Sequence, residues 1–449
     1  MHRFTEETAR LAEAVFGAAL ERLRADPPPL GRPAPADELS ARAGPTVTPG
    51  GLGPEGALRV FREVVVPATI PADHPGFLAF VPSAPTKAAA LADLLLGVSS
   101  MVGAGWIDGA GAIWAENEAL RWLADLAGLG PAAGGCFVSG GTAGNLSGLA
   151  AARHAARERR GDGPARWVLV TSTEAHASVR AAARLMDVDV VAVPAEHGRL
   201  TAARVREALD RVGEAAFAVA ATAGTTNAGA IDDLAGIAEA CEERDLWLHV
   251  DAAYGGAALC APSARDRFAG IERADSLVVD PHKWLFAPYD CCALLYRDPS
   301  VARGAFTQEA AYLEDANAAP GWNPMHLALH MSRRARGLPL WFSLAVHGTE
   351  AYREAVEAVL RLAREAAEEV RRRPALELVR DPELSVLLVR RRGWDAAALQ
   401  AWCDRVLAEA RAFVLPTTWE GERVLRLCFV NPRTPPELVR DLLEDLAAS

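Results

Sequence analysis

From about residue 135 onward, short apolar runs alternate with longer stretches that repeat apolar residues at helical spacing. The apolar runs are CFVS, WVLVTS, DVVAV, AFAVAATA, LWLHVDAA, SLVVD and CALLYR. Runs this apolar indicate strands that are buried on both faces of a sheet. Because helical stretches separate them, the pattern predicts an α/β protein with a parallel sheet covered by helices on both faces.

The flanking segments differ from this pattern. Residues 4–24 predict an amphipathic helix, and the Pro- and Gly-rich stretch 27–53 predicts a linker or an extended arm, with disorder as the alternative. Residues 345–373 predict a long charged helix, and mixed α and β structure follows it. We therefore expect an N-terminal helix and arm over 1–66, a large domain over 67–338 and a smaller α+β domain over 339–449.

Composition excludes several classes of protein. The 449 residues carry a formal net charge of −11, which argues against nucleic acid or an anionic membrane as the main partner. Seven cysteines are scattered without CxxC spacing, so a disulfide framework is not expected and a reducing cytoplasm is the expected location. The longest apolar stretch, 88–106, contains Asp93, so we expect no membrane span and no signal segment.

Two chemically reactive side chains follow predicted strands. Lys283, in DPHKW, comes directly after the strand that ends at Asp280, and ligands bind at the carboxyl ends of such strands. With Trp284 beside it, Lys283 is a candidate amine nucleophile with a lowered pKa, or else a surface lysine. Asp251 ends another apolar strand and needs a cationic partner, which could be the pyridinium nitrogen of pyridoxal phosphate (PLP), an ion pair or a helix N-terminus.

Three further motifs have both a functional and a structural interpretation. In FVSGGTAGN, the backbone at Gly141 and Thr142 could bind a phosphate at a helix N-terminus, but the spacing fits neither a dinucleotide fingerprint nor a P-loop. His176 opens a helix and could stack on a cofactor ring or cap that helix. Thr225 and Thr226 follow a strand and could donate hydroxyl protons to a phosphate.

The motifs SGGTAGN, EAHASV, AGTTNAGAID, HVDAAYGG and DPHKW occur together in this order. In this respect the chain resembles the group II PLP-dependent amino acid decarboxylases, and most of all their aromatic branch, from about His74 to Phe429. The resemblance implies the PLP-dependent transferase fold type I, like that of aspartate aminotransferase, with PLP bound in the large domain. It also implies a homodimer with active sites at the interface and an amino acid, a small molecule, as substrate.

The resemblance implies a role for each motif residue. Lys283 would hold PLP as a Schiff base, Asp251 would pair with the ring nitrogen, Ala253 would pack below the ring and His176 above it. The positions that correspond to the phosphate and its surroundings are Gly141, Thr142, Thr226, His282 and Ser83. Asp280 stands where the family commonly has Asn, so either its carboxylate turns away from the phosphate or it is protonated.

The proton donor implied by the resemblance is Tyr312, on a mobile loop that closes over the neighbouring subunit's site. A packed surface tyrosine is the alternative. Related aldehyde synthases usually have phenylalanine at this position, so Tyr312 favours decarboxylation to the amine and CO2. The catalytic set expected is therefore Lys283, His176, Tyr312 and Asp251.

The positions that match the substrate pocket are Phe80, Val81 and Pro82, together with Val102, Ala104 and Trp106 from the partner subunit, and Ser332. Ala104 is smaller than usual in aromatic members, and Ser332 matches histidine-type members. Among these positions, which would form the wall of the substrate pocket, no basic residue is evident that could bind a side-chain carboxylate. This disfavours glutamate and aspartate as substrates. We expect an aromatic L-amino acid as substrate; the alternatives are an aldehyde synthase or a decarboxylase of a non-aromatic or non-proteinogenic amino acid. A metal site at His326 and His330 is not expected.

Overall fold

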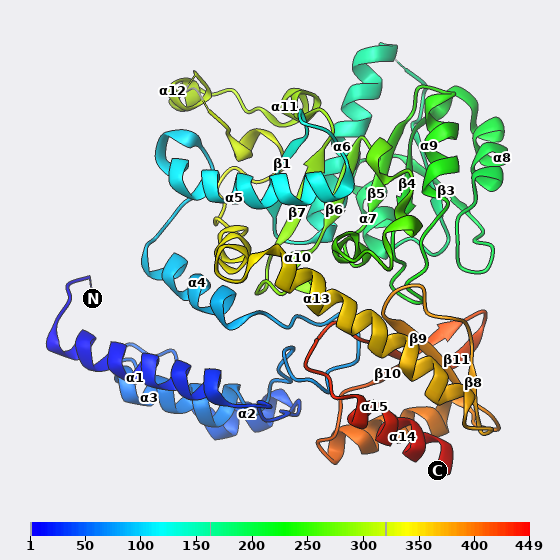
Figure 1. The fold of residues 1–449 in the computed structure, drawn as a ribbon. Helices are drawn as coiled ribbons and strands as arrows, with labels where there is room; N and C mark the ends of the chain where they lie inside the picture. Colours follow the sequence, from blue (N-terminus) through cyan, green and yellow to red (C-terminus); the bar gives the residue numbers. More distant parts are fainter. Residues whose placement is uncertain (1, 162, 319–320) are drawn as a thin grey trace.

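The computed structural model describes residues 2–161, 163–318 and 321–449 of the chain. A seven-stranded sheet in the order β1-β7-β6-β5-β4-β2-β3 lies at its centre (Figure 1). The strands are β1 Gly134–Val138, β2 Val168–Ser172, β3 Asp189–Val193, β4 Ala216–Thr222, β5 Trp247–Asp251, β6 Ser276–Val279 and β7 Cys292–Tyr296. Each apolar run found in the sequence forms one of these strands, which confirms the α/β prediction.

One strand departs from the predicted parallel sheet. β7 runs antiparallel to both β6 and β1, whereas β6, β5, β4, β2 and β3 pair in parallel. The segment between β6 and β7 contains only the short helix α10, Pro281–Trp284, and a parallel crossover normally uses a full helix that packs on the sheet. The chain therefore turns back beside β6, and Lys283 lies in this turn.

Helices cover both faces of the sheet, as predicted. Strand side chains alternate between two buried apolar clusters, one shared with α6, α7 and α11 and the other with α5, α8, α9 and α13. The helices of this part are α4 Lys87–Val98, α5 Trp106–Ala127, α6 Gly141–Arg160, α7 Ala177–Leu185, α8 Ala202–Val212, α9 Leu234–Glu242, α11 Pro299–Phe306, α12 Glu314–Ala318 and α13 Leu338–Arg371. Within the described ranges, every helix is too short or too polar to cross a membrane.

The C-terminal part has a second, antiparallel sheet in the order β10-β11-β9-β8. It comprises β8 Leu376–Leu378, β9 Val386–Arg391, β10 Leu415–Trp419 and β11 Glu422–Cys428, with helices α14 Ala396–Ala408 and α15 Pro436–Ala448. The helix expected over 345–373 begins earlier, at Leu338, and kinks at Gly348. Gly348 has a φ of +74°, a conformation that glycine adopts without the steric cost of a Cβ.

Three helices form the N-terminal part, at one edge of the molecule and apart from the central sheet (Figure 1). α1, Glu6–Arg24, confirms the predicted amphipathic helix. The stretch expected to be an extended linker contains α2, Ala36–Ala43, because Pro35 precedes a first turn with two acidic residues, a sequence that favours a helix start. α3, Gly53–Val60, follows, and no side chain of these three fully described helices is buried.

Candidate active site

A cavity of about 300 Å³ opens at the carboxyl edge of the central sheet. β1, β4, β5 and β6 share one direction, so the segments that follow them meet at this edge. The cavity is lined by Ser139, Gly140, Gly141, Thr142, Asn145, His176, Thr222, Gly224, Thr226, Asp251, Ala253, Tyr254, Asp280, His282, Lys283 and Tyr289. The structure thus brings together most of the residues predicted to bind the cofactor.

Lys283 forms an ion pair inside this cavity. Its Nζ lies 2.9 Å from Oδ2 of Asp280, and the two side chains are 23% and 2% exposed. Burial by itself would lower the pKa of Lys283, but the negative charges of Asp280 and Asp251 outweigh it and raise the pKa. The sequence predicted a lowered pKa for Lys283, and this prediction is wrong for the protein without PLP. The amine must lose a proton before it can act as a nucleophile.

Asp280 faces the cavity as a carboxylate. Its Oδ2 also accepts a hydrogen bond of 3.3 Å from the backbone N–H of Gly141. Burial would raise the pKa of Asp280, but the charges of Lys283 and His282 lower it overall. Protonation of Asp280, one of the two states expected from the sequence, is therefore not favoured, because Lys283 balances the buried charge. The other, a carboxylate turned away from the cofactor phosphate, stays a prediction. The other oxygen, Oδ1, has no hydrogen-bond partner among the described residues.

The N-terminus of α6 borders the cavity at Gly141 and Thr142. A Cβ at Gly141 would lie 3.2 Å from both the Cβ of Ala253 and Oδ2 of Asp280, so glycine keeps this part of the cavity open. Free backbone N–H groups at a helix N-terminus stabilise an anion such as phosphate. Thr226 lines the same cavity, whereas the Thr225 hydroxyl accepts the N–H of Ala230 and has a structural role.

Asp251 is 5% exposed and is oriented by two hydrogen bonds. Its Oδ1 accepts the N–H of Ala253 at 3.1 Å, and its Oδ2 accepts Nδ2 of Asn145 at 2.8 Å. The sequence analysis missed Asn145, although it stands four residues after Gly141 in the SGGTAGN motif and so lies about one helical turn further along the same face. His176 both lines the cavity and caps α7, where its side chain accepts the N–H of Ser178.

His282 and Tyr289 form another wall of the cavity. Nδ1 of His282 lies 2.7 Å from the carbonyl oxygen of Cys291, and burial lowers the pKa of this imidazole. The ring of Tyr289 packs against it with the centroids 4.7 Å apart. Tyr289 is 54% exposed and was also missed, because nothing in its local sequence distinguishes it from an ordinary loop tyrosine.

Ser83 is not part of the cavity lining. Its hydroxyl donates to the carbonyl of Ala287 at 2.9 Å, so it supports the loop after Lys283. The predicted wall residue Phe80 is 61% exposed, and its carbonyl accepts Nη1 of Arg426 at 2.6 Å. Arg426 also donates from Nε to the carbonyl of Thr226. The sequence analysis found no basic residue near this wall, which is wrong, because β11 supplies one from the C-terminal part.

The other predicted pocket residues lie outside this cavity. Val102, Ala104 and Trp106 lie at or just before the start of α5, and Ser332 is exposed. Tyr312 is 77% exposed, and its hydroxyl is 4.0 Å from the sulfur of Met331. The assignment of Val102, Ala104, Trp106 and Tyr312 to the neighbouring subunit's site stays a prediction, as does the place of Ser332 in the pocket.

The predicted histidine pair does not share a helix face. His326 ends a 3-10 turn, Pro324–His326, and its Nε2 lies 2.8 Å from Oδ1 of Asn317. His330 lies in the loop that follows. In the ranges that the structure describes, no cluster of three or more His, Cys, Asp or Glu side chains could hold a metal ion.

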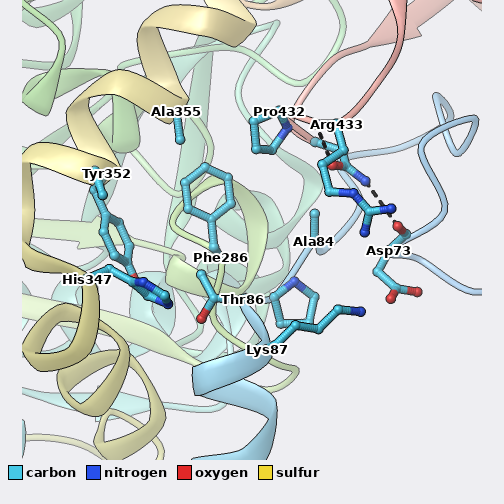
Figure 2. Close-up of a pocket in the computed structure, with 13 residues that line it drawn as sticks. Asp73, Ala84, Thr86, Lys87, Phe286, His347, Tyr352, Ala355, Pro432 and Arg433 are labelled. Atoms are coloured by element: carbon cyan, nitrogen blue, oxygen red, sulfur yellow. Dashed lines mark hydrogen bonds between the residues drawn. The ribbon is translucent and has the colours of Figure 1, made fainter. Parts of the chain in front are cut away.

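A separate cavity of about 330 Å³ lies between the start of α4, the kinked helix α13 and residues 431–433 (Figure 2). Phe286, from the loop after Lys283, projects into it beside Tyr352. The hydroxyls of Tyr352 and Thr86 each lie 2.6 Å from Oγ of Ser343. The lining is mostly apolar and contains none of the motif residues, so we assign the chemistry to the first cavity.

A family model for the pyridoxal-dependent decarboxylase conserved domain matches residues 57–391. The chain belongs to this family. This decarboxylase is 31% identical over 436 residues to the aromatic-L-amino-acid decarboxylase of Bacillus atrophaeus, covering 94% of this chain and 90% of that one. It is 32% identical over 389 residues to the L-2,4-diaminobutyrate decarboxylase of Rhizobium meliloti (strain 1021), covering 83% and 77%. The crystal structure of Oryza sativa TDC with PLP and tryptamine superposes with a TM-score of 0.91 at 26% identity, covering 100% and 99%.

These comparisons confirm the family, the PLP fold type I architecture and the class of enzyme: a PLP-dependent amino acid decarboxylase. The cavity fits the cofactor. It combines a buried carboxylate at Asp251, an amine at Lys283 and a glycine-opened helix N-terminus at Gly141. Asp251 is a suitable partner for a pyridinium ring, and Lys283 for an aldehyde carbon. The helix N-terminus at Gly141 is a suitable partner for a phosphate.

Asp280→Asn is expected to make Lys283 reactive at lower pH. Without the Asp280 charge, burial becomes the main effect on the Lys283 amine and lowers its pKa. A larger fraction of neutral amine then exists at neutral pH. The rate at which the apoprotein incorporates PLP, followed by absorbance as a function of pH, should shift to lower pH by about one unit or more.

The matched control is Asp290→Asn, on the same loop. Asp290 pairs with Arg336 at 2.9 Å and does not contact Lys283. This variant should keep the wild-type pH profile of PLP incorporation. An unchanged profile in Asp280→Asn would show that the Asp280 charge does not control the Lys283 amine.

Proposed function

We propose that this decarboxylase converts an aromatic L-amino acid to the corresponding amine and CO2. The main support for this proposal is that Asp251, at the end of β5, and Lys283, after the neighbouring strand β6, line the same cavity. Phe80 has an exposed ring, and Arg426 links its carbonyl to that of the cavity residue Thr226, which supports an aromatic side chain in the substrate. The similarity to a relative named as an aromatic-L-amino-acid decarboxylase supports the same substrate class.

When bound, PLP supplies an electron sink for the pair of electrons left when CO2 departs. Lys283 is the amine that would hold the cofactor's aldehyde carbon, and Asp251 would stabilise positive charge on its ring nitrogen. The α6 N-terminus at Gly141 and Thr142 would bind its phosphate. His176 and Ala253, which both line the cavity, would contact the ring.

Tyr312 is proposed as the proton donor to the carbon that has lost CO2. It does not line the cavity of its own chain, and its ring is 77% exposed. A tyrosine that serves the partner subunit's site would have this exposure in a single chain. Tyr312 lies in the short helix Ala311–Leu313, between α11 and α12, where it could cover a neighbouring site.

A homodimer is proposed on the basis of unpartnered apolar faces. Leu91, Leu95 and Val98 follow helical spacing on α4 and are 44%, 54% and 67% exposed. Phe16 and Leu20 of α1 are 52% and 47% exposed at spacing i, i+4. Contiguous exposed apolar faces of this kind mark protein interfaces. A second copy of the chain would cover them.

Phe16→Asp is expected to weaken the dimer, because it places a charge in the apolar face of α1. We expect the dissociation constant to rise by about 10-fold or more in sedimentation velocity. Leu185→Asp is the matched control: Leu185 is 75% exposed at the end of α7, away from these helices, and its replacement should leave the dimer intact. Equal dissociation of both variants, or of neither, would contradict the assigned interface.

The test of the proposed function is a substrate panel. PLP-loaded protein is incubated with the common L-amino acids, DOPA and 2,4-diaminobutyrate, and CO2, amine, aldehyde and peroxide are measured. Amine equimolar with CO2 from an aromatic substrate supports the proposal. Because Arg426 contacts Phe80 and is basic, the panel also includes glutamate and aspartate. Faster turnover of either acid than of the aromatic amino acids would overturn the aromatic assignment. Aldehyde with peroxide would indicate an aldehyde synthase instead.

A further inference from the structure

A continuous series of hydrogen bonds runs behind the cavity from Trp247 to Asp251. Nε1 of Trp247 donates to Oγ of Ser276 at 2.8 Å, and this hydroxyl lies 2.7 Å from Nδ1 of His249. Nε2 of His249 lies 2.9 Å from Oδ1 of Asn145. Nδ2 of Asn145 then donates to Oδ2 of Asp251 at 2.8 Å. All five side chains are buried.

The Asp251 end of this series determines the direction of its hydrogen bonds. A carboxylate accepts, so the amide nitrogen of Asn145 faces Asp251 and Oδ1 of Asn145 faces His249. An amide oxygen can only accept, so the ring proton of His249 is on Nε2. Nδ1 of the neutral ring then accepts the proton of Ser276, whose oxygen accepts from the indole N–H of Trp247.

A branch leaves the series at Asn145 and reaches His176. Nδ2 of Asn145 also donates to Oγ of Ser178 at 2.9 Å. The Ser178 hydroxyl is then free to donate to Nδ1 of His176, at 2.8 Å, and the Ser178 backbone N–H faces the same nitrogen at 3.2 Å. Because two donors face Nδ1, this nitrogen of His176 accepts and Nε2 is left to face the cavity as a donor.

Packing and burial keep the series in this arrangement. A Cβ at Gly148 would lie 2.8 Å from the ring of His249, so glycine allows α6 to pack directly on the imidazole. Burial lowers the pKa of His249 to about 4, despite the nearby charge of Asp251. The imidazole is therefore neutral above that pH, as the direction of its hydrogen bonds requires.

We propose that Asn145 is a positioning residue whose single amide orients the carboxylate of Asp251 and, through the Ser178 hydroxyl, strengthens the hydrogen bonding at Nδ1 of His176. The inference rests on the roles proposed above for Asp251 and His176. It predicts that a loss of the amide N–H groups weakens cofactor binding and changes its response to pH, beyond any effect on folding. The amide thus couples two of the residues that surround the cofactor ring.

Asn145→Asp is the direct test, because it keeps the shape of the side chain and removes both donors. The new carboxylate faces Asp251 as a like charge, and the Ser178 hydroxyl turns towards it and away from His176. We expect the PLP dissociation constant of the apoprotein to rise by about 10-fold or more. The pH midpoint of the bound cofactor's absorbance should shift as well. Ser178→Ala should shift the pH profile of kcat while keeping PLP affinity.

Asn431→Asp is the matched control. Asn431 is 4% exposed and Asn145 is 1% exposed, and the Asn431 amide donates to the carbonyl of Asp73, outside the active-site cavity. This variant should lose thermal stability but keep PLP affinity and the pH midpoint. Wild-type PLP binding and pH midpoint in Asn145→Asp, or equal losses of PLP affinity in both variants, would overturn the inference. Wild-type protein that binds PLP but decarboxylates no amino acid would instead overturn the proposed function.

Discussion

Replacing Lys283 with alanine is expected to abolish decarboxylation. Lys283 is the amine in the cavity that lies at the end of β6, where it can hold the cofactor and later release the product. Alanine removes this nucleophile, so we expect the release of CO2 and amine to fall by more than about 10³-fold. The measurement is turnover with saturating PLP and substrate, by mass spectrometry of the amine.

The same substitution also leaves Asp280 buried without a cation, and breaking a buried ion pair costs about 3–5 kcal/mol of stability. The double variant Lys283→Ala with Asp280→Asn separates the two effects. It removes the unpaired charge and should recover most of the lost thermal stability, but none of the turnover. A Lys283→Ala protein with more than a few per cent of wild-type turnover would contradict the role of Lys283.

Tyr312→Phe is expected to redirect the product from amine to aldehyde. Phenylalanine keeps the ring but cannot donate a proton to the carbon that has lost CO2. General acid catalysis of this kind contributes about 10²–10⁴-fold, so amine formation should fall by that order. Any remaining reaction with O2 should appear as aldehyde and peroxide. Amine formation at the wild-type rate would show that another group delivers the proton.

Mixed dimers test whether Tyr312 acts across the interface. Neither Lys283→Ala nor Tyr312→Phe protein should form amine at an appreciable rate alone. If Tyr312 serves the partner's site, a hybrid of the two has one site with both Lys283 and Tyr312, and amine formation should return to about half of the wild-type rate per hybrid dimer. If Tyr312 serves its own chain's site, the hybrid has no complete site and activity should not return.

Local pattern was sufficient to predict most of the fold. The seven central strands were predicted from apolar runs because a strand buried on both faces must be apolar along its length. The reversal of β7 was not predicted, because it follows from the short connection after β6 and not from the composition of either strand. The kink at Gly348 was also missed, since an isolated glycine in a helical pattern does not show where a helix changes direction.

The residues of the candidate site also fall into those that local sequence predicted and those that it did not. Lys283, Asp251, His176 and Gly141 were predicted because each belongs to a short motif next to a strand end, and the resemblance to a family joined those motifs. Asn145 was missed even though it lies in the SGGTAGN motif, because its partner Asp251 is distant in sequence. Tyr289 was missed because nothing in its local sequence distinguishes it from an ordinary loop tyrosine. Arg426 reaches the wall at Phe80 from a strand of the C-terminal sheet, and no local pattern predicts that contact.

The sequence by itself therefore determined the class of fold, the cofactor and the identity of the reactive amine, since these depend on residue types at short, ordered spacings. The tertiary structure alone decided the charge state of that amine. Asp280 raises the pKa of Lys283 because folding holds the two groups 2.9 Å apart in a buried site. It also decided which hydrogen-bond donors face Asp251, because electrostatic and hydrogen-bond energies depend on distance and direction in space, which the order of residues does not specify.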